Sequence, residues 1–87
     1  MSETAIVVVE DDPHIADLLD LYLRNEGYRV LLSPDADRGL AAVRDHSPRV
    51  AILDVGLGGG IDGFEVCRRL RAGDPTLGII MLTARDD

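Results

Sequence analysis

Four short apolar segments set the strongest limit on how this chain can fold. Residues 5–9, 50–53 and 79–82 consist of aliphatic residues, many of them β-branched, without a polar residue among them. Segments of this length and composition are typical of strands buried on both faces, as in a parallel sheet covered by helices. The fourth segment, residues 28–32, contains Arg29. We therefore expect this strand at a less buried edge of the sheet.

The segments between these strands carry helix signals. Asp12-Pro13 is a typical helix start, with a side-chain acceptor at the cap and proline at the first position, and Gly27 is a typical end. The apolar residues between them recur at helical spacing and are predicted to face the sheet: Ile15, Leu18, Leu19, Tyr22 and Leu23.

Two further helices complete the predicted order. One is expected from Ser33-Pro34 to about residues 46–48, and the other from about residue 64 to residue 71. Strands and helices then alternate as βαβαβαβ with short connections. This order predicts the α/β class, with a doubly wound parallel sheet.

Each buried strand stops at a residue that can take part in chemistry. The first stops at Glu10 and Asp11, the third at Asp54 and the last at the hydroxyl of Thr83. In open parallel sheets, ligands bind outside the carboxyl ends of the strands. Neighbouring strands lie about 4.8 Å apart. If the first and third strands are neighbours, their three carboxylates converge in one pocket.

Carboxylates held so close together repel one another, so either their pKa values rise or a divalent cation lies among them. Oxygen ligands in small number favour Mg²⁺, which keeps several waters and also binds phosphoryl oxygens. Asp54 could then act as a nucleophile and form an acyl phosphate, with Thr83 placed to donate a hydrogen bond to it. The alternative, that these acids only cap helices, accounts for Asp12 but not for the whole group.

Composition limits which partners the chain is expected to bind and in which cellular compartment it is expected. Sixteen acidic residues against nine basic ones give a net charge of −7, which argues against nucleic acid or an anionic membrane as a partner. A single cysteine, Cys67, excludes an internal disulfide and is read as a small buried hydrophobe. The first residues lack the basic segment of a signal peptide, and no apolar segment could span a membrane. We expect a cytoplasmic protein.

Four motifs together resemble the receiver domain of bacterial response regulators: residues 6–12, 52–55, 62–66 and 81–85. The resemblance runs through the whole chain in the right order. It implies the flavodoxin-like strand order 2-1-3-4 and phosphorylation of Asp54 by a sensor histidine kinase. It implies no enzyme beyond self-catalysed phosphorylation and dephosphorylation. Residues 82–87 look most like the subfamily that carries a winged-helix DNA-binding output domain, which implies a role in transcription.

The resemblance also implies a role for each site residue. Asp11 would bind Mg²⁺ directly and Glu10 mainly through a metal-bound water, while the backbone carbonyl of Gly56 completes the protein ligands beside Asp54. Thr83 would be the switch hydroxyl. Ala84 would be the small residue that leaves room for the phosphoryl group.

The chain departs from the family pattern at two points. Gly58 stands where the family usually has proline, and the glycines at 58–60 carry one extra residue. The chain also stops at Asp87 and contains no lysine. The resemblance would require a fourth helix, a fifth strand, a fifth helix and a lysine that contacts the phosphoryl group. We therefore expect residues 1–87 to be the N-terminal part of a single receiver domain without its output domain.

Two alternative functions stay open at this point. The chain could be a receiver-like core with little phosphorylation activity that serves in a protein–protein assembly. Under either function, we expect the bare edge left by the missing unit to be hidden in a homo-oligomer, with exchange of elements as one route. A Mg²⁺-dependent phosphohydrolase with an aspartyl nucleophile is the second alternative. Against it, Gly56 stands where such enzymes have a second aspartate as general acid.

Overall fold

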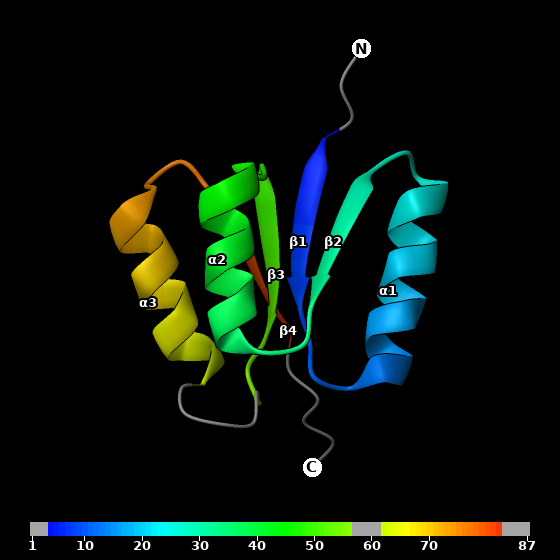
Figure 1. Cartoon of the computed structure of the whole chain (residues 1–87), viewed down its shortest axis with the longest axis horizontal. Coiled ribbons are helices and arrows are strands. Elements are labelled where there is room, and N and C mark those ends of the chain that lie inside the picture. Colours follow the sequence, from blue (N-terminus) through cyan, green and yellow to red (C-terminus); the bar gives the residue numbers. More distant parts are fainter. Residues whose placement is uncertain (1–3, 57–61, 83–87) are drawn as a thin grey trace.

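The computed structural model describes residues 4–56 and 62–82, which form a parallel sheet and three helices (Figure 1). The elements in chain order are β1 (Ala5–Val9), α1 (Pro13–Asn25), β2 (Arg29–Ser33), α2 (Ala36–His46), β3 (Val50–Asp54), α3 (Gly63–Gly73) and β4 (Gly78–Leu82). The strands are all parallel and lie in the order β2-β1-β3-β4. Both the predicted order of elements and the predicted strand order are confirmed.

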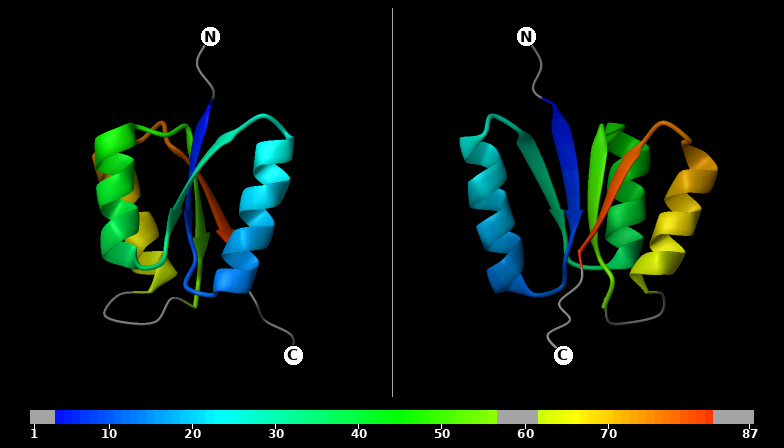
Figure 2. Two further views of the ribbon diagram at one scale, coloured as in Figure 1. Left: turned by 45° about the vertical axis from the view of Figure 1, so that its right-hand side comes forward. Right: turned by 180° about the vertical axis from the view of Figure 1, so that it is seen from behind.

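The helices cover the two faces of the sheet unequally. Figure 1 and the rotated views in Figure 2 show α2 and α3 on one face and α1 on the other. Alternate residues of β1 supply both sides: Val7 and Val9 belong to the larger core under α2 and α3, whereas Ile6 and Val8 belong to a smaller core under α1. This burial on both faces explains why β1 is an unbroken apolar run.

The apolar residues of α1 do not all face the sheet as predicted. Leu19 and Leu23 pack against the smaller core, but Ile15, Leu18 and Tyr22 are 37%, 69% and 73% exposed. Ala16 is the buried residue of this helix, so the face that meets the sheet is centred one position further along the chain. The prediction was wrong for the three exposed residues because two apolar stripes lie side by side on α1, and the pattern does not say which one meets the sheet.

Two helix starts also differ from the prediction. β2 continues through Ser33, and α2 begins only at Ala36, where the Oδ1 atom of Asp35 accepts a hydrogen bond from the Arg38 N–H at 2.8 Å. Helix α3 is longer than predicted at both ends, with Asp62 as its N-cap. In both helices an aspartate side chain sets the first turn.

Three further predictions concern the edge strand of the sheet, Cys67 and membrane-spanning helices. β2 is an edge strand with Arg29 exposed, as predicted. Cys67 packs against the larger core as predicted for a small hydrophobe, but it is half-buried and not fully buried. Within residues 4–56 and 62–82, no helix combines the length and apolar character that a bilayer span requires.

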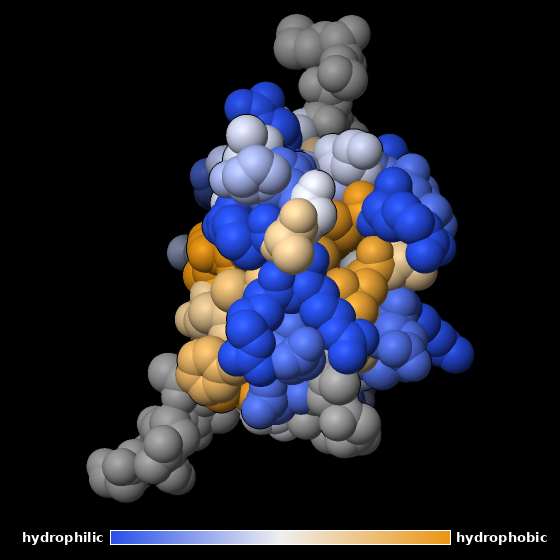
Figure 3. Space-filling model, turned by 90° about the vertical axis from the view of Figure 1, so that its left-hand side faces the viewer, coloured by the Kyte–Doolittle hydropathy of each residue, from blue (hydrophilic) through white to orange (hydrophobic). Residues whose placement is uncertain are grey.

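The outer side of α3 is strongly hydrophilic. Figure 3 shows this side, where hydrophilic surface separates two hydrophobic areas. The arginines of α3 contribute to it: Arg68 and Arg69 both pair with Glu65, and Arg71 donates hydrogen bonds to the carbonyls of Asp74 and Pro75. These residues were predicted to form a solvated helix face, and their exposure confirms it.

Candidate functional site

Three carboxylates meet at the carboxyl edge of the sheet. Glu10 and Asp11 directly follow β1, and Asp54 is the last residue of β3, which pairs with β1 in the register Val9 to Leu53. One carboxylate oxygen from each of the three acids lies within 4.8 Å of the others. The predicted convergence of these residues is therefore confirmed.

Glu10 is the buried member of the group, with only 4% of its surface exposed. Its backbone N–H donates to the carbonyl oxygen of Ser33 at 3.0 Å, and its Oε2 atom accepts from the Asp12 N–H at 3.1 Å. The pKa of Glu10 is raised from 4.5 to about 7, chiefly by burial. The carboxylates of Asp54 and Asp11 contribute smaller parts of this rise, while the Asp12 N–H acts against it.

Asp54 is half-buried and its carboxylate is oriented by the loop that follows. Its Oδ1 atom accepts a hydrogen bond from the Gly56 N–H at 3.0 Å. The next residue, Val55, donates its N–H to the carbonyl oxygen of Leu82 at 2.9 Å. The loop thus leaves β3 tied both to the Asp54 side chain and to the end of β4. Whether the Gly56 carbonyl serves as a ligand stays a prediction.

Asp12 belongs to helix α1 and not to this group. Its Oδ1 atom accepts hydrogen bonds from the N–H groups of His14 at 2.9 Å and Ile15 at 3.4 Å. It is therefore the helix cap that the sequence indicated. Two adjacent aspartates, Asp11 and Asp12, are thus separated into a site residue and a structural residue.

The remaining predicted site residues, Thr83 and Ala84, lie outside the described residues, as do the glycines at 58–60. β4 ends at Leu82, which is paired in register with Asp54. β4 therefore ends beside Asp54, one residue before Thr83. Thr83 is predicted to donate a hydrogen bond to the phosphoryl group on Asp54.

The donor set fits a small divalent cation. All three side chains offer carboxylate oxygens, which suit hard ions such as Mg²⁺ and Ca²⁺. Oxygens bound to one Mg²⁺ lie about 2.1 Å from the ion, and hence no more than about 4.2 Å apart. The three carboxylate oxygens, which lie within 4.8 Å of one another, are close to this spacing. A protein site with only a few carboxylates is typical of Mg²⁺, which retains several waters.

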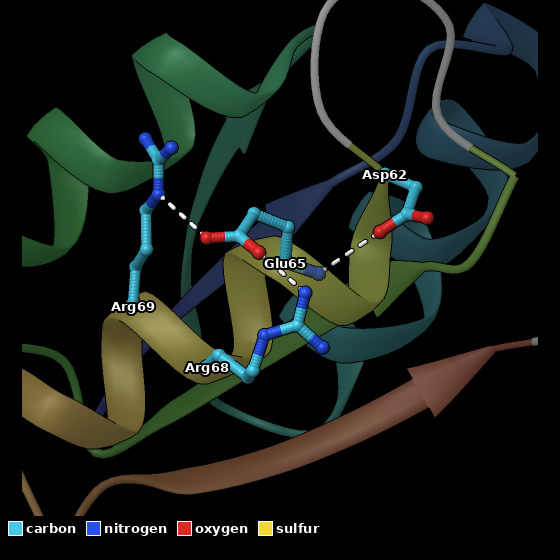
Figure 4. Close-up of polar contacts among 4 residues, drawn as sticks. All are labelled: Asp62, Glu65, Arg68 and Arg69. Atoms are coloured by element: carbon cyan, nitrogen blue, oxygen red, sulfur yellow. Dashed lines mark hydrogen bonds and ion pairs between the residues drawn. The ribbon is translucent and has the colours of Figure 1, made fainter.

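The start of α3 borders the loop that follows Asp54. That this helix lies beside the site was not predicted from the sequence. Figure 4 shows the Oδ1 atom of Asp62 accepting a hydrogen bond from the Glu65 N–H, at 2.9 Å. The carboxylate of Glu65 in turn pairs with Arg68, and with the Nε atom of Arg69 at 3.1 Å. These arginines hold the pKa of Glu65 below its usual value. The first two turns of α3 therefore form one hydrogen-bonded unit next to the site.

Comparisons with known proteins agree on the family to which the chain belongs. Residues 6–87 match the family described as the response regulator receiver domain. The transcriptional regulatory protein AfsQ1 of Streptomyces coelicolor is 46% identical over 83 residues, which are 95% of this chain and 36% of AfsQ1. The DNA-binding response regulator MtrA of Mycolicibacterium smegmatis is 44% identical over 82 residues, covering 94% of this chain and 35% of MtrA. The chain thus spans about a third of the length of these relatives.

A solved structure extends the similarity to the fold. The response regulator protein TrrA from Thermotoga maritima, solved in complex with Mg²⁺-BeF, has a TM-score of 0.89 to this chain and is 32% identical. The match covers 95% of this chain and 71% of that chain. The described strands and helices are therefore arranged as in a receiver domain.

Proposed function

The chain belongs to the response regulator receiver domain family, and we propose that it is a phosphoacceptor in two-component signalling, with Asp54 as the residue that is phosphorylated. The observation that carries this proposal is the convergence of Glu10, Asp11 and Asp54 at the ends of β1 and β3. A sensor histidine kinase is the proposed donor and partner. The cytoplasm is the proposed compartment.

The proposed reaction transfers one phosphoryl group to a carboxylate. An oxygen of Asp54 attacks the phosphorus of a phosphohistidine, so that an O–P bond forms as the P–N bond breaks and the released imidazole takes up a proton from solvent. Asp54 suits this role because it is half-buried at a strand end and its orientation is set by the Gly56 N–H. Thr83 would donate a hydrogen bond to the new phosphoryl group, and Ala84 would leave space for it.

The acids around Asp54 are proposed to hold Mg²⁺. Asp11 would bind the ion directly, Glu10 mainly through a water, and the Gly56 carbonyl together with Asp54 would complete the protein ligands. When bound, the ion supplies positive charge that offsets the negative charge of the incoming phosphoryl oxygens. The complex of TrrA with Mg²⁺-BeF supports the same chemistry for this chain.

The proposed output is control of transcription. AfsQ1 is named as a transcriptional regulatory protein and MtrA as a DNA-binding response regulator. We propose that the present residues form the N-terminal part of a receiver whose output is a winged-helix DNA-binding domain. The net charge of −7 suits a part that does not itself contact DNA.

Magnesium titration of matched variants tests the ligand set. Asp11→Asn and Asp12→Asn remove the same charge from adjacent residues, but Asp11 lies in the carboxylate group and Asp12 caps α1. Isothermal titration should show Mg²⁺ binding weakened about 10-fold or more by Asp11→Asn and changed by no more than about twofold by Asp12→Asn. Equal losses in both variants would show that Mg²⁺ senses only the general negative charge of this edge.

The assembly alternative is favoured by one observation, the exposure of Leu18 and Tyr22 on α1. Large apolar side chains exposed together are typical of interaction surfaces. Mg²⁺ binding without phosphorylation of Asp54 would support this alternative. Multiple turnover of a phosphomonoester would instead support a phosphohydrolase.

A further inference from the structure

Gly63 lies against the backbone that carries Asp54. It is the first residue of α3 and is buried. A Cβ atom at this position would lie 2.4 Å from the carbonyl oxygen of Asp54 and 2.8 Å from the Cα atom of Val55. Both neighbours are backbone atoms, so no side-chain rotation can relieve the overlap. Any residue other than glycine would push the start of α3 away from the end of β3.

The close approach brings α3 into direct hydrogen bonding with this segment. The N–H of Gly63 donates to the carbonyl oxygen of Val55 at 3.2 Å, while the N–H of Val55 donates to the carbonyl oxygen of Leu82 at 2.9 Å. Val55 is thus held by α3 on one side and by the end of β4 on the other. It stands between Asp54 and Gly56, whose N–H orients the Asp54 carboxylate.

Helix α3 is itself well anchored. Asp62 caps its first turn, and Val66 and Leu70 are buried in the larger core. The start of the helix therefore has a fixed position relative to the sheet. The segment that it contacts takes its position from the same core.

We propose that Gly63 is a positioning residue for the acidic site: its missing side chain lets α3 approach closely enough to hold the Asp54–Gly56 segment where Mg²⁺ and the phosphoryl group meet. Gly63 acts through backbone contacts and touches neither the metal ligands' carboxylates nor the reacting atoms. The inference rests on the proposed function of the acidic site.

The test compares Gly63→Ala with two controls in the same helix. Gly73→Ala makes the same chemical change where an added Cβ atom meets nothing within 4 Å. Leu70→Ala removes a buried side chain and destabilises α3 without touching its first turn. Isothermal titration with Mg²⁺ should show affinity reduced about 10-fold or more by Gly63→Ala, as for loss of other groups that support metal ligands. Both controls should stay within about twofold of wild type.

A second measurement needs no metal. In the metal-free protein, the backbone amide resonances of Val55 and Gly56 should shift, and their hydrogen exchange should accelerate, in Gly63→Ala but not in Gly73→Ala. Unchanged amides in a folded Gly63→Ala protein, or a loss of Mg²⁺ affinity in Leu70→Ala as large as in Gly63→Ala, would overturn the inference. If wild type itself fails to bind Mg²⁺, the proposed function fails, and the metal-free amides still decide the role of Gly63.

A milder pair of variants covers the case in which Gly63→Ala does not fold. Asp62→Ala and Asp62→Asn remove the same charge, but only asparagine can still cap the first turn next to Gly63. The alanine variant should bind Mg²⁺ more weakly than the asparagine variant, by about threefold or more, if loss of the cap reaches the site. Equal affinities in these two variants would contradict the proposed coupling between α3 and the site.

Discussion

Glu10 shows how the fold sets the chemistry of a single residue. Its carboxyl group is buried beside two other acids, and its pKa is raised to about 7, mainly by burial. The native protein therefore binds a proton that the unfolded chain, with a pKa of 4.5, has already lost above that pH. The stability that this proton contributes is complete below pH 4.5 and is lost as the pH rises through about 7.

The corresponding prediction concerns stability against pH. Without divalent cations, the free energy of unfolding should fall between pH 5 and pH 8, with a contribution from Glu10 on the order of 3 kcal/mol. Glu10→Gln keeps a neutral side chain at all pH values and should remove most of this slope. Urea denaturation of both proteins at several pH values measures the effect. An equally steep slope in the glutamine variant would show that other groups cause it.

At the scale of elements, aspartates set the starts of α1, α2 and α3. Asp12, Asp35 and Asp62 each accept a hydrogen bond from a backbone N–H in the first turn. Acids thus serve two purposes in this chain, as caps and as the members of the site. Within residues 4–56 and 62–82, three aspartates cap helices and three other acids form the carboxylate group of the site.

The cap of α2 offers a prediction that is independent of the site. Asp35→Ala should lower the free energy of unfolding by about 1 kcal/mol, because the Arg38 N–H loses its side-chain acceptor. Asp35→Asn keeps an acceptor and should cost much less. Chemical denaturation measures both values. A cost as large for asparagine as for alanine would mean that the charge of Asp35, and not the cap hydrogen bond, stabilises the helix.

The helices show what the sequence could and could not predict. The order of elements follows from apolar strand segments and from glycine and proline at the connections. The predicted burial of the last strand on both faces was wrong, because β4 is the other edge strand and Ile80 is 50% exposed. The orientation of α1 could not be derived, since Leu18 and Leu19 are equally apolar and only the packing decides which one is covered. The extent of β2 was missed because Ser33-Pro34 resembles a helix start, although the Ser33 carbonyl instead accepts a hydrogen bond from Glu10.

The site, like the fold, could be predicted only in part from the sequence. Its carboxylates could be predicted because strand ends in a parallel sheet share one edge. A raised pKa at this edge was one of two outcomes predicted from crowding, but its main cause, the burial of Glu10, was not predicted. The contact of Gly63 with Asp54 could not be predicted at all, because it depends on how closely a helix approaches a strand and not on any residue pattern.

At the scale of the whole molecule, the sheet is covered unevenly. α2 and α3 cover one face, while only α1 lies on the other among residues 4–56 and 62–82 (Figure 2). Exposed apolar residues gather on that side, with Leu18 and Tyr22 on α1 and Ile80 on β4. Association of this chain with a second copy, by docking or by exchange of elements, stays a prediction that this distribution favours.

The central claim is that three carboxylates at the sheet edge form a Mg²⁺-dependent phosphoacceptor site. Intact mass after incubation with acetyl phosphate tests it most directly, with and without Mg²⁺ and with Asp54→Asn as control. The account predicts one phosphoryl group on the wild-type chain, only when Mg²⁺ is present, and none on the asparagine variant. A wild-type chain that binds Mg²⁺ but gains no phosphoryl group, or an adduct that persists in Asp54→Asn, would contradict it.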